Sequence, residues 1–243
     1  MYEPIGKAEL YLSVGLSAIH CIDEALGKNA VHRILDFPSG YGRVLRFLEI
    51  RFPKAEIIAG EIDPMALEFC KREFSVSTLM SHKNFSNIRL PLQADLIWSG
   101  SLITHINEKR ASELLQLFCK HLAPGGLCLF TTHGLTSVKW IETKAYTYGL
   151  SVNAQEKLVS ELHKSGYEYV NYESLKNYGL SVVSRERMTQ IASSAGQWTQ
   201  SFFLESGWVG HHDVYGFTKL IPRTYSPTVL RGSARLTCRR SNA

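Results

Sequence analysis

Short apolar runs alternate with longer stretches of helical periodicity through most of the chain. The apolar runs predict strands at residues 32–38, 55–63, 76–81, 94–100 and 127–134, of which the first reads as buried and the third has the weakest pattern. The stretches between them predict a glycine turn and a helix at residues 39–52, a helix at residues 64–74, and a helix ended by a Pro-Gly-Gly turn at residues 107–126. Near the N-terminus, Leu12, Leu16, Ile19 and Ala25 recur at helical spacing, which predicts an amphipathic helix that covers the sheet with this face.

The alternation of strands and helices is typical of a doubly wound α/β fold. Such connections give a mostly parallel sheet with helices on both faces. Residues 184–196 predict a further helix, and residues 201–220 predict two strands joined by a glycine-containing loop, which form an antiparallel pair at the end of the chain. We therefore expect a seven-stranded sheet whose functional residues follow the carboxyl ends of the strands.

One segment interrupts the alternation. We expect residues 1–222 to form one domain, with an insertion or lid at residues 135–177 after the fifth strand and a basic, flexible tail at residues 223–243. The insertion is rich in tyrosine, which is compatible either with an aromatic lid over a ligand or with half-buried packing. Its tyrosines are Tyr146, Tyr148, Tyr167, Tyr169 and Tyr172.

The charge of the chain is uneven. Five of the 27 basic residues lie in residues 223–243, which contain no acidic residue, so the rest is balanced at 22 basic and 22 acidic side chains. This balance argues against nucleic acid as a partner, because phosphate contacts need clustered Lys and Arg. The sequence shows neither a membrane-spanning run nor a signal peptide. Its five cysteines form no CxxC pair, so we expect a cytoplasmic protein without a structural zinc site.

The segment that carries candidate chemistry joins the first strand to the following helix. It places Asp36 at the strand end, then Gly40 and Gly42, and a helix N-terminus whose free amides favour an anionic group. A dinucleotide fingerprint needs a third small residue, where Leu45 stands, so NAD or FAD is disfavoured. Glu61 ends the second strand, where an acid can bind the hydroxyls of a ribose.

Four segments in this order resemble the class I S-adenosylmethionine (SAM)-dependent methyltransferases. DFPSGYGR resembles their glycine-rich motif, with Pro38 in place of the first glycine, and AGEIDPMALEFC resembles their second motif. DLIWSGSLITHI resembles the fourth-strand motif, and HLAPGGLCLFTTHG resembles the segment before and within strand five. The resemblance covers residues 33–134 and implies a Rossmann-like fold with SAM as the cofactor.

The resemblance also implies which residues bind SAM. The methionine half would lie against Asp36, Pro38, Gly40 and Gly42, whereas Glu61 would bind the ribose and Ile62 would pack on the adenine. Further cofactor contacts follow strands three and four; these are Ser81, His82, Trp98, Ser99 and Gly100.

Two histidines are candidate general bases. His105 and His133 follow strands four and five, although each could instead be a packing or loop residue. Tyr178 could line the same pocket. His211 and His212 are adjacent, and neighbours in a strand point to opposite faces, so we expect no joint metal site there.

We therefore predict SAM-dependent methyl transfer to a small-molecule or glycan-type acceptor. Two alternatives remain: a non-catalytic SAM- or nucleoside-binding module that regulates a partner, and a dinucleotide-dependent oxidoreductase. The sequence contains none of the acceptor-specific motifs NPPY, DPPY or a reactive Cys-Pro pair.

Overall fold

Seven strands form one sheet, as expected from the sequence. The computed structural model describes residues 5–27, 29–90, 93–173, 175 and 178–222. The strands lie in the order β3-β2-β1-β4-β5-β9-β8, with β1 to β5 parallel and β9 antiparallel to both β5 and β8. Their bounds are β1 Arg33–Asp36, β2 Glu56–Glu61, β3 Ser77–Met80, β4 Ala94–Ser99, β5 Leu122–His133, β8 Trp198–Trp208 and β9 His212–Lys219.

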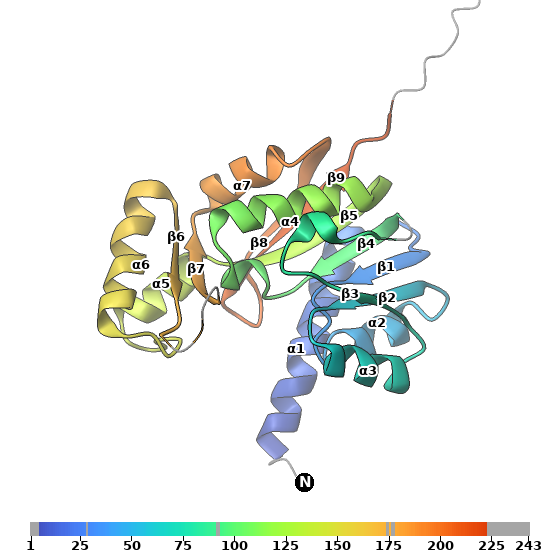
Figure 1. The fold of residues 1–243 in the computed structure, drawn as a ribbon, viewed down its shortest axis with the longest axis horizontal. Coiled ribbons are helices and arrows are strands. Elements are labelled where there is room, and N and C mark those ends of the chain that lie inside the picture. Colours follow the sequence, from blue (N-terminus) through green and yellow to red (C-terminus); the bar gives the residue numbers. More distant parts are fainter. Residues whose placement is uncertain (1–4, 28, 91–92, 174, 176–177, 223–243) are drawn as a thin grey trace, which may run out of the picture.

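Helices cover both faces of this sheet (Figure 1). On one face lie α4 Glu108–His121 and α7 Arg185–Ser193; on the other lie α1 Ile5–Leu26, α2 Leu45–Arg51 and α3 Pro64–Glu73. Alternate residues of each strand face opposite layers, so Leu35 packs in the core under α4, whereas Ile34 packs in the core under α1. Both cores are formed mainly by aliphatic and aromatic side chains.

The helix starts follow the local sequence. Pro64 is the first residue of α3, and Asp63 caps it by accepting a hydrogen bond from the Met65 amide at 2.9 Å. The helix expected before the Pro-Gly-Gly turn at residues 124–126 is present, but it is shorter than predicted, since α4 ends at His121 and β5 begins at Leu122 and includes the turn residues. Gly126 explains the difference: a Cβ there would lie 2.9 Å from the Ala123 carbonyl oxygen and 3.1 Å from those of Ala94 and Asp95, so the chain already runs against β4.

The face that α1 presents to the sheet overlaps the predicted one only in part, since Ile19 and Ala25 pack partly buried against the core. Leu12 and Leu16 are exposed by 47% and 57%, whereas Val14, Ala18, Cys21, Ile22 and Leu26 are buried. Apolar residues surround the helix, so periodicity alone does not select the buried side. Small residues decide it: a Cβ at Gly15 would lie 2.1 Å from the ring of Phe47 on α2, so only this side allows such close packing.

An accessory unit follows β5 at one end of the sheet (Figure 1). It contains α5 Leu135–Glu142, α6 Val152–Ser165 and the antiparallel strands β6 Tyr167–Asn171 and β7 Gly179–Val183. Its residues form a separate core cluster that includes Leu158, Leu162 and Leu180. Because β7 pairs with β6, this unit extends beyond residue 177, the predicted end of the insertion, to Val183. Two short 3-10 helices, Phe85–Asn87 and Ile103–His105, follow β3 and β4.

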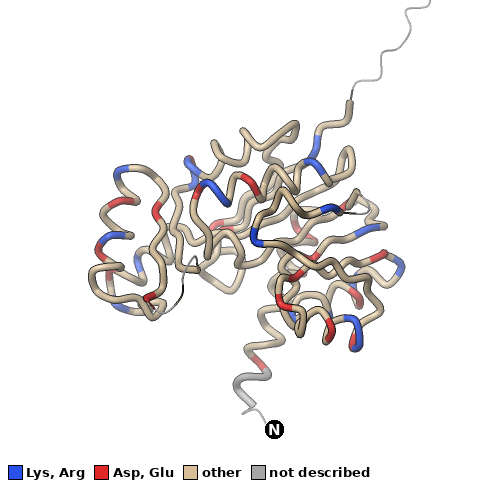
Figure 2. Tube along the Cα trace, in the orientation of Figure 1, with Lys and Arg blue, Asp and Glu red and all other residues tan. Residues whose placement is uncertain are grey.

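Charged residues are spread over the described chain. Figure 2 shows Lys and Arg interleaved with Asp and Glu along the helices and loops. Among the described residues, no helix combines the length and apolarity needed to cross a bilayer. The predicted basic tail, residues 223–243, lies outside the described residues.

Candidate functional site

A cleft of about 840 Å³ opens at the carboxyl ends of the parallel strands and extends to the accessory unit. Six residues predicted from the sequence line it: Pro38, Glu61, Ile62, Ser81, His82 and His105. Tyr169 and Tyr178, which the sequence suggests as lid or pocket residues, line it as well. The structure adds others from the loops after β3 and β4 and from the accessory unit: Lys83, Phe85, Ser101, Leu102, Ile106, Asn107, Arg110 and Asn171. The cleft is therefore formed jointly by the sheet edge and the accessory unit.

The two glycines of the turn after β1 differ in their surroundings. Both have positive φ, +50° at Gly40 and +77° at Gly42. A Cβ at Gly40 would meet nothing within 4 Å, whereas a Cβ at Gly42 would lie 2.3 Å from the ring of Phe74. Gly40 thus leaves open space that a ligand can enter, and Gly42 is required by the packing of the turn against Phe74.

Glu61 ties the end of β2 to this turn. Its carboxylate accepts hydrogen bonds from the amides of Gly40 at 2.9 Å, Ile62 at 2.6 Å and Asp63 at 3.2 Å. The side chain is only 8% exposed, yet it belongs to the cleft lining. The acid at the tip of β2 is therefore held in one orientation, with the cleft on its open side.

Asp36 lies beneath the turn and is fully buried. Its Oδ2 has no hydrogen-bond partner among the described residues, and neither has the buried Oγ of Ser39. Burial, followed by the negative charge of Glu61, raises the pKa of Asp36 well above its usual range. These two polar atoms lie beside the glycine turn without a partner among the described residues, although neither Asp36 nor Ser39 belongs to the cleft lining.

Ser81 and His82 follow β3, where the adenine contacts are expected. The Ser81 amide donates to the Glu61 carbonyl at 2.7 Å, which continues the β2–β3 pairing past the strand end. His82 is exposed, and its Nδ1 accepts from the Asn84 amide at 2.9 Å. Beside them, the buried Phe85 packs under the Arg110 guanidinium at 4.8 Å and offers an apolar wall.

The predicted residues at the end of β4 shape the strand end without lining the cleft. The Trp98 ring is buried on the opposite face of the sheet, 5.6 Å from the Trp208 ring. A Cβ at Gly100 would lie 2.9 Å from Trp208, so this glycine admits the tryptophan pair. Ser99 is fully buried, and its Oγ has no partner among the described residues.

His105 is the predicted base that lies in the cleft. Its Nδ1 donates to the Gly179 carbonyl of β7 at 2.7 Å, which leaves Nε2 as the acceptor nitrogen. The ring stacks on Tyr178 at 4.7 Å between centroids. Burial lowers the pKa of His105, partly offset by the hydrogen bond to Gly179, so the imidazole is neutral near pH 7.

His133, the second predicted base, lies behind His105 and does not line the cleft. The two rings are 6.4 Å apart, and His133 is only 3% exposed. Burial, and then the neighbouring His105 and His211, lower the pKa of His133 to about 3.

The expectation that His211 and His212 point apart is wrong. Strand alternation does not apply to them, because His211 lies in the turn before β9, after two residues of positive φ, Val209 and Gly210. The turn brings both rings onto His133, and one nitrogen of each of the three rings lies within 4.8 Å of the others.

Several lining residues had no recognisable signal in the sequence. Asn171 comes from β6, and its approach to the cleft depends on how the accessory unit folds back. Arg110 is held by a hydrogen bond from its Nη2 to the Lys83 carbonyl at 2.9 Å. Of the insertion's tyrosines, Tyr169 lines the cleft, whereas Tyr167 is buried and donates to the Ile106 carbonyl at 2.9 Å.

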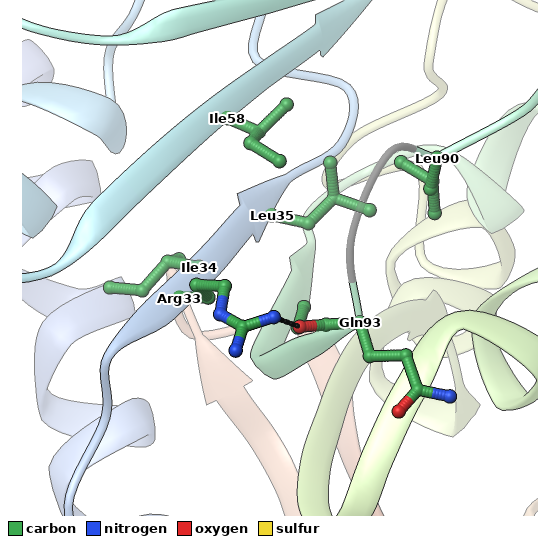
Figure 3. A pocket seen from close by; sticks show the side chains of 7 residues that line it. Arg33, Ile34, Leu35, Ile58, Leu90 and Gln93 are labelled. Atoms are coloured by element: carbon green, nitrogen blue, oxygen red, sulfur yellow. Dashed lines mark hydrogen bonds between the residues drawn. The ribbon is translucent and has the colours of Figure 1, made fainter.

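A second, much smaller cavity lies near the opposite ends of the strands (Figure 3). It measures about 10 Å³ and is bounded mainly by Ile34, Leu35, Ile58 and Leu90. The Arg33 side chain donates to the Gln93 carbonyl at 3.2 Å beside it. A space of this size holds one water molecule at most, so this cavity is too small for an organic ligand.

Comparison with known proteins agrees with this geometry. A family model described as a methyltransferase domain matches residues 34–126, which run from β1 into the first residues of β5. No curated protein sequence matches the chain.

Three solved structures illustrate the shared fold. Human N-acetylserotonin methyltransferase in complex with SAM is 18% identical, with a TM-score of 0.59 over 88% of this chain and 53% of that chain. A SAM-dependent methyltransferase from Methanosarcina mazei is 13% identical, with a TM-score of 0.58 over 83% and 98%. SAM-bound CalS10, an amino pentose methyltransferase from Micromonospora echinaspora, is 14% identical, with a TM-score of 0.57 over 90% and 98%. The chain spans about half the length of the human enzyme and of the next two relatives that it matches.

Proposed function

We propose that this chain, which has the fold and the domain of the class I SAM-dependent methyltransferases, binds SAM in the large cleft and methylates a small-molecule or glycan-type acceptor. The observation that carries the proposal is the pairing of an open glycine turn with a fixed acid. Gly40 leaves free space at the end of β1, and Glu61 faces the cleft from the end of β2.

The residues at the sheet edge fit the cofactor. Glu61 would bind the ribose hydroxyls, because its carboxylate can accept further hydrogen bonds on the cleft side. Ile62 and Phe85 offer apolar surface for the adenine, and Ser81 and His82 border it. The unpartnered oxygens of Asp36 and Ser39 lie beside the turn, where the methionine half would be held.

Bound SAM supplies a methyl group that is already activated by its positive sulfur. The chain must then hold the acceptor in line with that group and exclude water. We assign acceptor binding to the accessory-unit side of the cleft, where Leu102, Ile106, Tyr169 and Tyr178 provide a mostly apolar wall. The tyrosines of β6 and of the segment before β7 thus serve as a cover over the acceptor.

His105 is placed to receive a proton from the acceptor. Its Nδ1 proton is committed to Gly179, so Nε2 carries the free lone pair, and its lowered pKa keeps the ring neutral. A hydroxyl or nitrogen acceptor that loses its proton during transfer would give it to this nitrogen. We assign the role to His105 rather than His133, because only His105 lines the cleft.

The small-molecule class of acceptor is supported by two relatives whose names state their substrates, N-acetylserotonin and an amino pentose. The interleaved charges of the described chain favour neither nucleic acid nor another polyanion as partner. A cytoplasmic location stays a prediction from the cysteine content.

Parallel calorimetric titrations with SAM, S-adenosylhomocysteine and NAD⁺ test the cofactor. Binding of both adenosyl ligands in preference to NAD⁺ is expected; the reverse order would refute the proposal in favour of an oxidoreductase. Formation of S-adenosylhomocysteine from SAM, measured against a panel of hydroxyl and amine acceptors, tests the transfer. Binding of SAM without turnover on any acceptor would instead support a regulatory binding module.

A further inference from the structure

Three histidines converge behind the cleft although they come from two distant parts of the chain. His133 is the last residue of β5, and His212 is its direct partner across the β5–β9 ladder. His211 joins them from the tight turn between β8 and β9. The ring centroids are 4.4 Å apart for His211 and His212 and 4.6 Å apart for His133 and His212.

Each ring has one nitrogen already engaged. The Nδ1 of His133 donates to the Ser181 carbonyl at 3.3 Å, and the Nδ1 of His211 donates to the Val209 carbonyl at 3.0 Å. The Nδ1 of His212 lies 3.2 Å from the Thr131 hydroxyl oxygen. None of the hydrogen bonds formed among the described residues uses an Nε2 of these three rings.

This pattern is the one by which proteins orient metal-binding histidines. A carbonyl at Nδ1 sets the tautomer of His133 and of His211 and aims each Nε2 lone pair at the ion. The Thr131 hydroxyl fixes the His212 ring, although a hydroxyl can either donate or accept there. Here the outer partners are themselves held: the Thr131 hydroxyl accepts from the Ser101 amide at 2.9 Å, and Ser181 donates to the Ile103 carbonyl at 2.7 Å. The three rings are therefore fixed from outside, with their second nitrogens free.

A fourth group lies beside the cluster. The Tyr148 ring is 4.8 Å from the His133 ring and 6.2 Å from the His211 ring. Its hydroxyl is buried without a hydrogen-bond partner among the described residues. The backbone of Tyr148 has a φ of +54°, an uncommon conformation for a tyrosine, and Gly149 follows at +68°. The Tyr148 ring thus borders the cluster on the side of the accessory unit.

We propose that His133, His211 and His212 bind one divalent transition-metal ion, with Zn²⁺ as the ion best suited to them. Three imidazole nitrogens with one further position are a common zinc ligand set, and the absence of carboxylates among the three disfavours Mg²⁺ and Ca²⁺. His133 and His212 are 3% and 5% exposed, whereas His211 is half-buried and leaves a path for the ion. The ion would join β5, β9 and, through Ser181, the accessory unit.

The test uses the full chain, freed of metal by a chelator that is then removed. We expect about one equivalent of Zn²⁺ to remain after equilibrium dialysis, and the ion to raise the melting temperature because it binds the folded state. Co²⁺ should replace it and give the absorption of a tetrahedral nitrogen site. The absence of stoichiometric binding would overturn the proposal, and so would a thiolate charge-transfer band, which would assign the metal to cysteine.

Variants locate the site. His211→Ala, at a half-buried turn position, should weaken zinc binding by more than the roughly 10- to 100-fold typical of losing an outer partner. His163→Ala, at an exposed position of α6, should bind like the parent. Unchanged binding by His211→Ala, or by His133→Gln if the first variant fails to fold, would refute the assignment. None of these readouts requires SAM, so the result is independent of the proposed function.

Discussion

The two glycines of the β1–α2 turn provide a test that separates folding from ligand binding. Gly40 and Gly42 both have positive φ, which costs an L-residue about 1–2 kcal/mol. Gly40→Ala should lower the free energy of unfolding by about this amount, because its Cβ would meet nothing within 4 Å. Gly42→Ala carries a second cost, since its Cβ would lie 2.3 Å and 2.8 Å from two ring carbons of Phe74.

The Phe74 ring must move to admit the methyl group at residue 42. It is 7% exposed and is held between the Phe69 ring at 6.3 Å and the Arg46 guanidinium at 5.1 Å. Overpacking of this kind costs about 1–3 kcal/mol. We therefore expect Gly42→Ala to lose roughly 2–5 kcal/mol in total, a large part of the ~5–15 kcal/mol typical of a folded domain.

Urea unfolding measures the backbone cost and the overpacking cost when it is applied to Gly40→Ala and Gly42→Ala, each with and without Phe74→Ala. In the Gly42→Ala background, the cost of Phe74→Ala should fall by about 1–3 kcal/mol, because truncation of the ring also relieves the clash with the new methyl group. In the Gly40→Ala background it should be unchanged. Equal stability of Gly40→Ala and Gly42→Ala would show that the ring swings away freely and would refute the packing argument.

Ligand binding should rank the two glycines in the opposite order. A side chain at Gly40 enters the open space assigned to SAM, so Gly40→Val should lose SAM affinity while it remains folded. Gly42→Ala, where it remains folded, should bind SAM much like the parent. Native SAM affinity in Gly40→Val would place the cofactor elsewhere.

Three further predictions concern single side chains. Glu61→Ala should weaken SAM binding by about 1–3 kcal/mol, or roughly 5- to 150-fold in the Kd measured by calorimetry. The control Glu56→Ala, at the exposed far end of the same strand, should bind SAM like the parent, and equal effects of the two variants would argue against the ribose contact. His105→Gln should lower kcat by about 10²–10⁴-fold and leave the Kd for SAM unchanged. The rate of the parent protein should decline only below about pH 6.5, because the pKa of His105 is lowered. An undiminished kcat in the variant would show that methyl transfer needs only the positioning of the acceptor and no general base. Because the pKa of Asp36 is raised, its contribution to stability is fully present below about pH 3.9 and is lost as the pH rises through the pKa of the folded state. Asp36→Asn should therefore flatten the decline of the unfolding free energy with pH. A decline in the variant that parallels that of the parent would place the titration on another group.

Local sequence was sufficient for the sheet and for one edge of the site. Buried strands, glycine turns and helix starts are properties of neighbouring residues, so the strand ends and their residues Pro38, Glu61 and His105 could be placed without a structure. The pairing of β8 with β9 also followed from two strand-like runs around a short loop. Periodicity and the rule that parallel strands end at one edge placed Glu61 and His105, whereas the cofactor role of Pro38 was implied by the resemblance to the methyltransferases.

Tertiary structure decided what depends on partners distant along the chain. Which side of α1 is buried was set by the fit of Gly15 against Phe47, and the need for glycine at residue 42 was set by Phe74. Tyr169 and Asn171 reach the cleft because the accessory unit folds back over the strand ends. The three histidines meet because a turn releases His211 from strand alternation while the ladder places His212 opposite His133. Periodicity describes one element at a time, and contacts between elements become defined only when the chain packs.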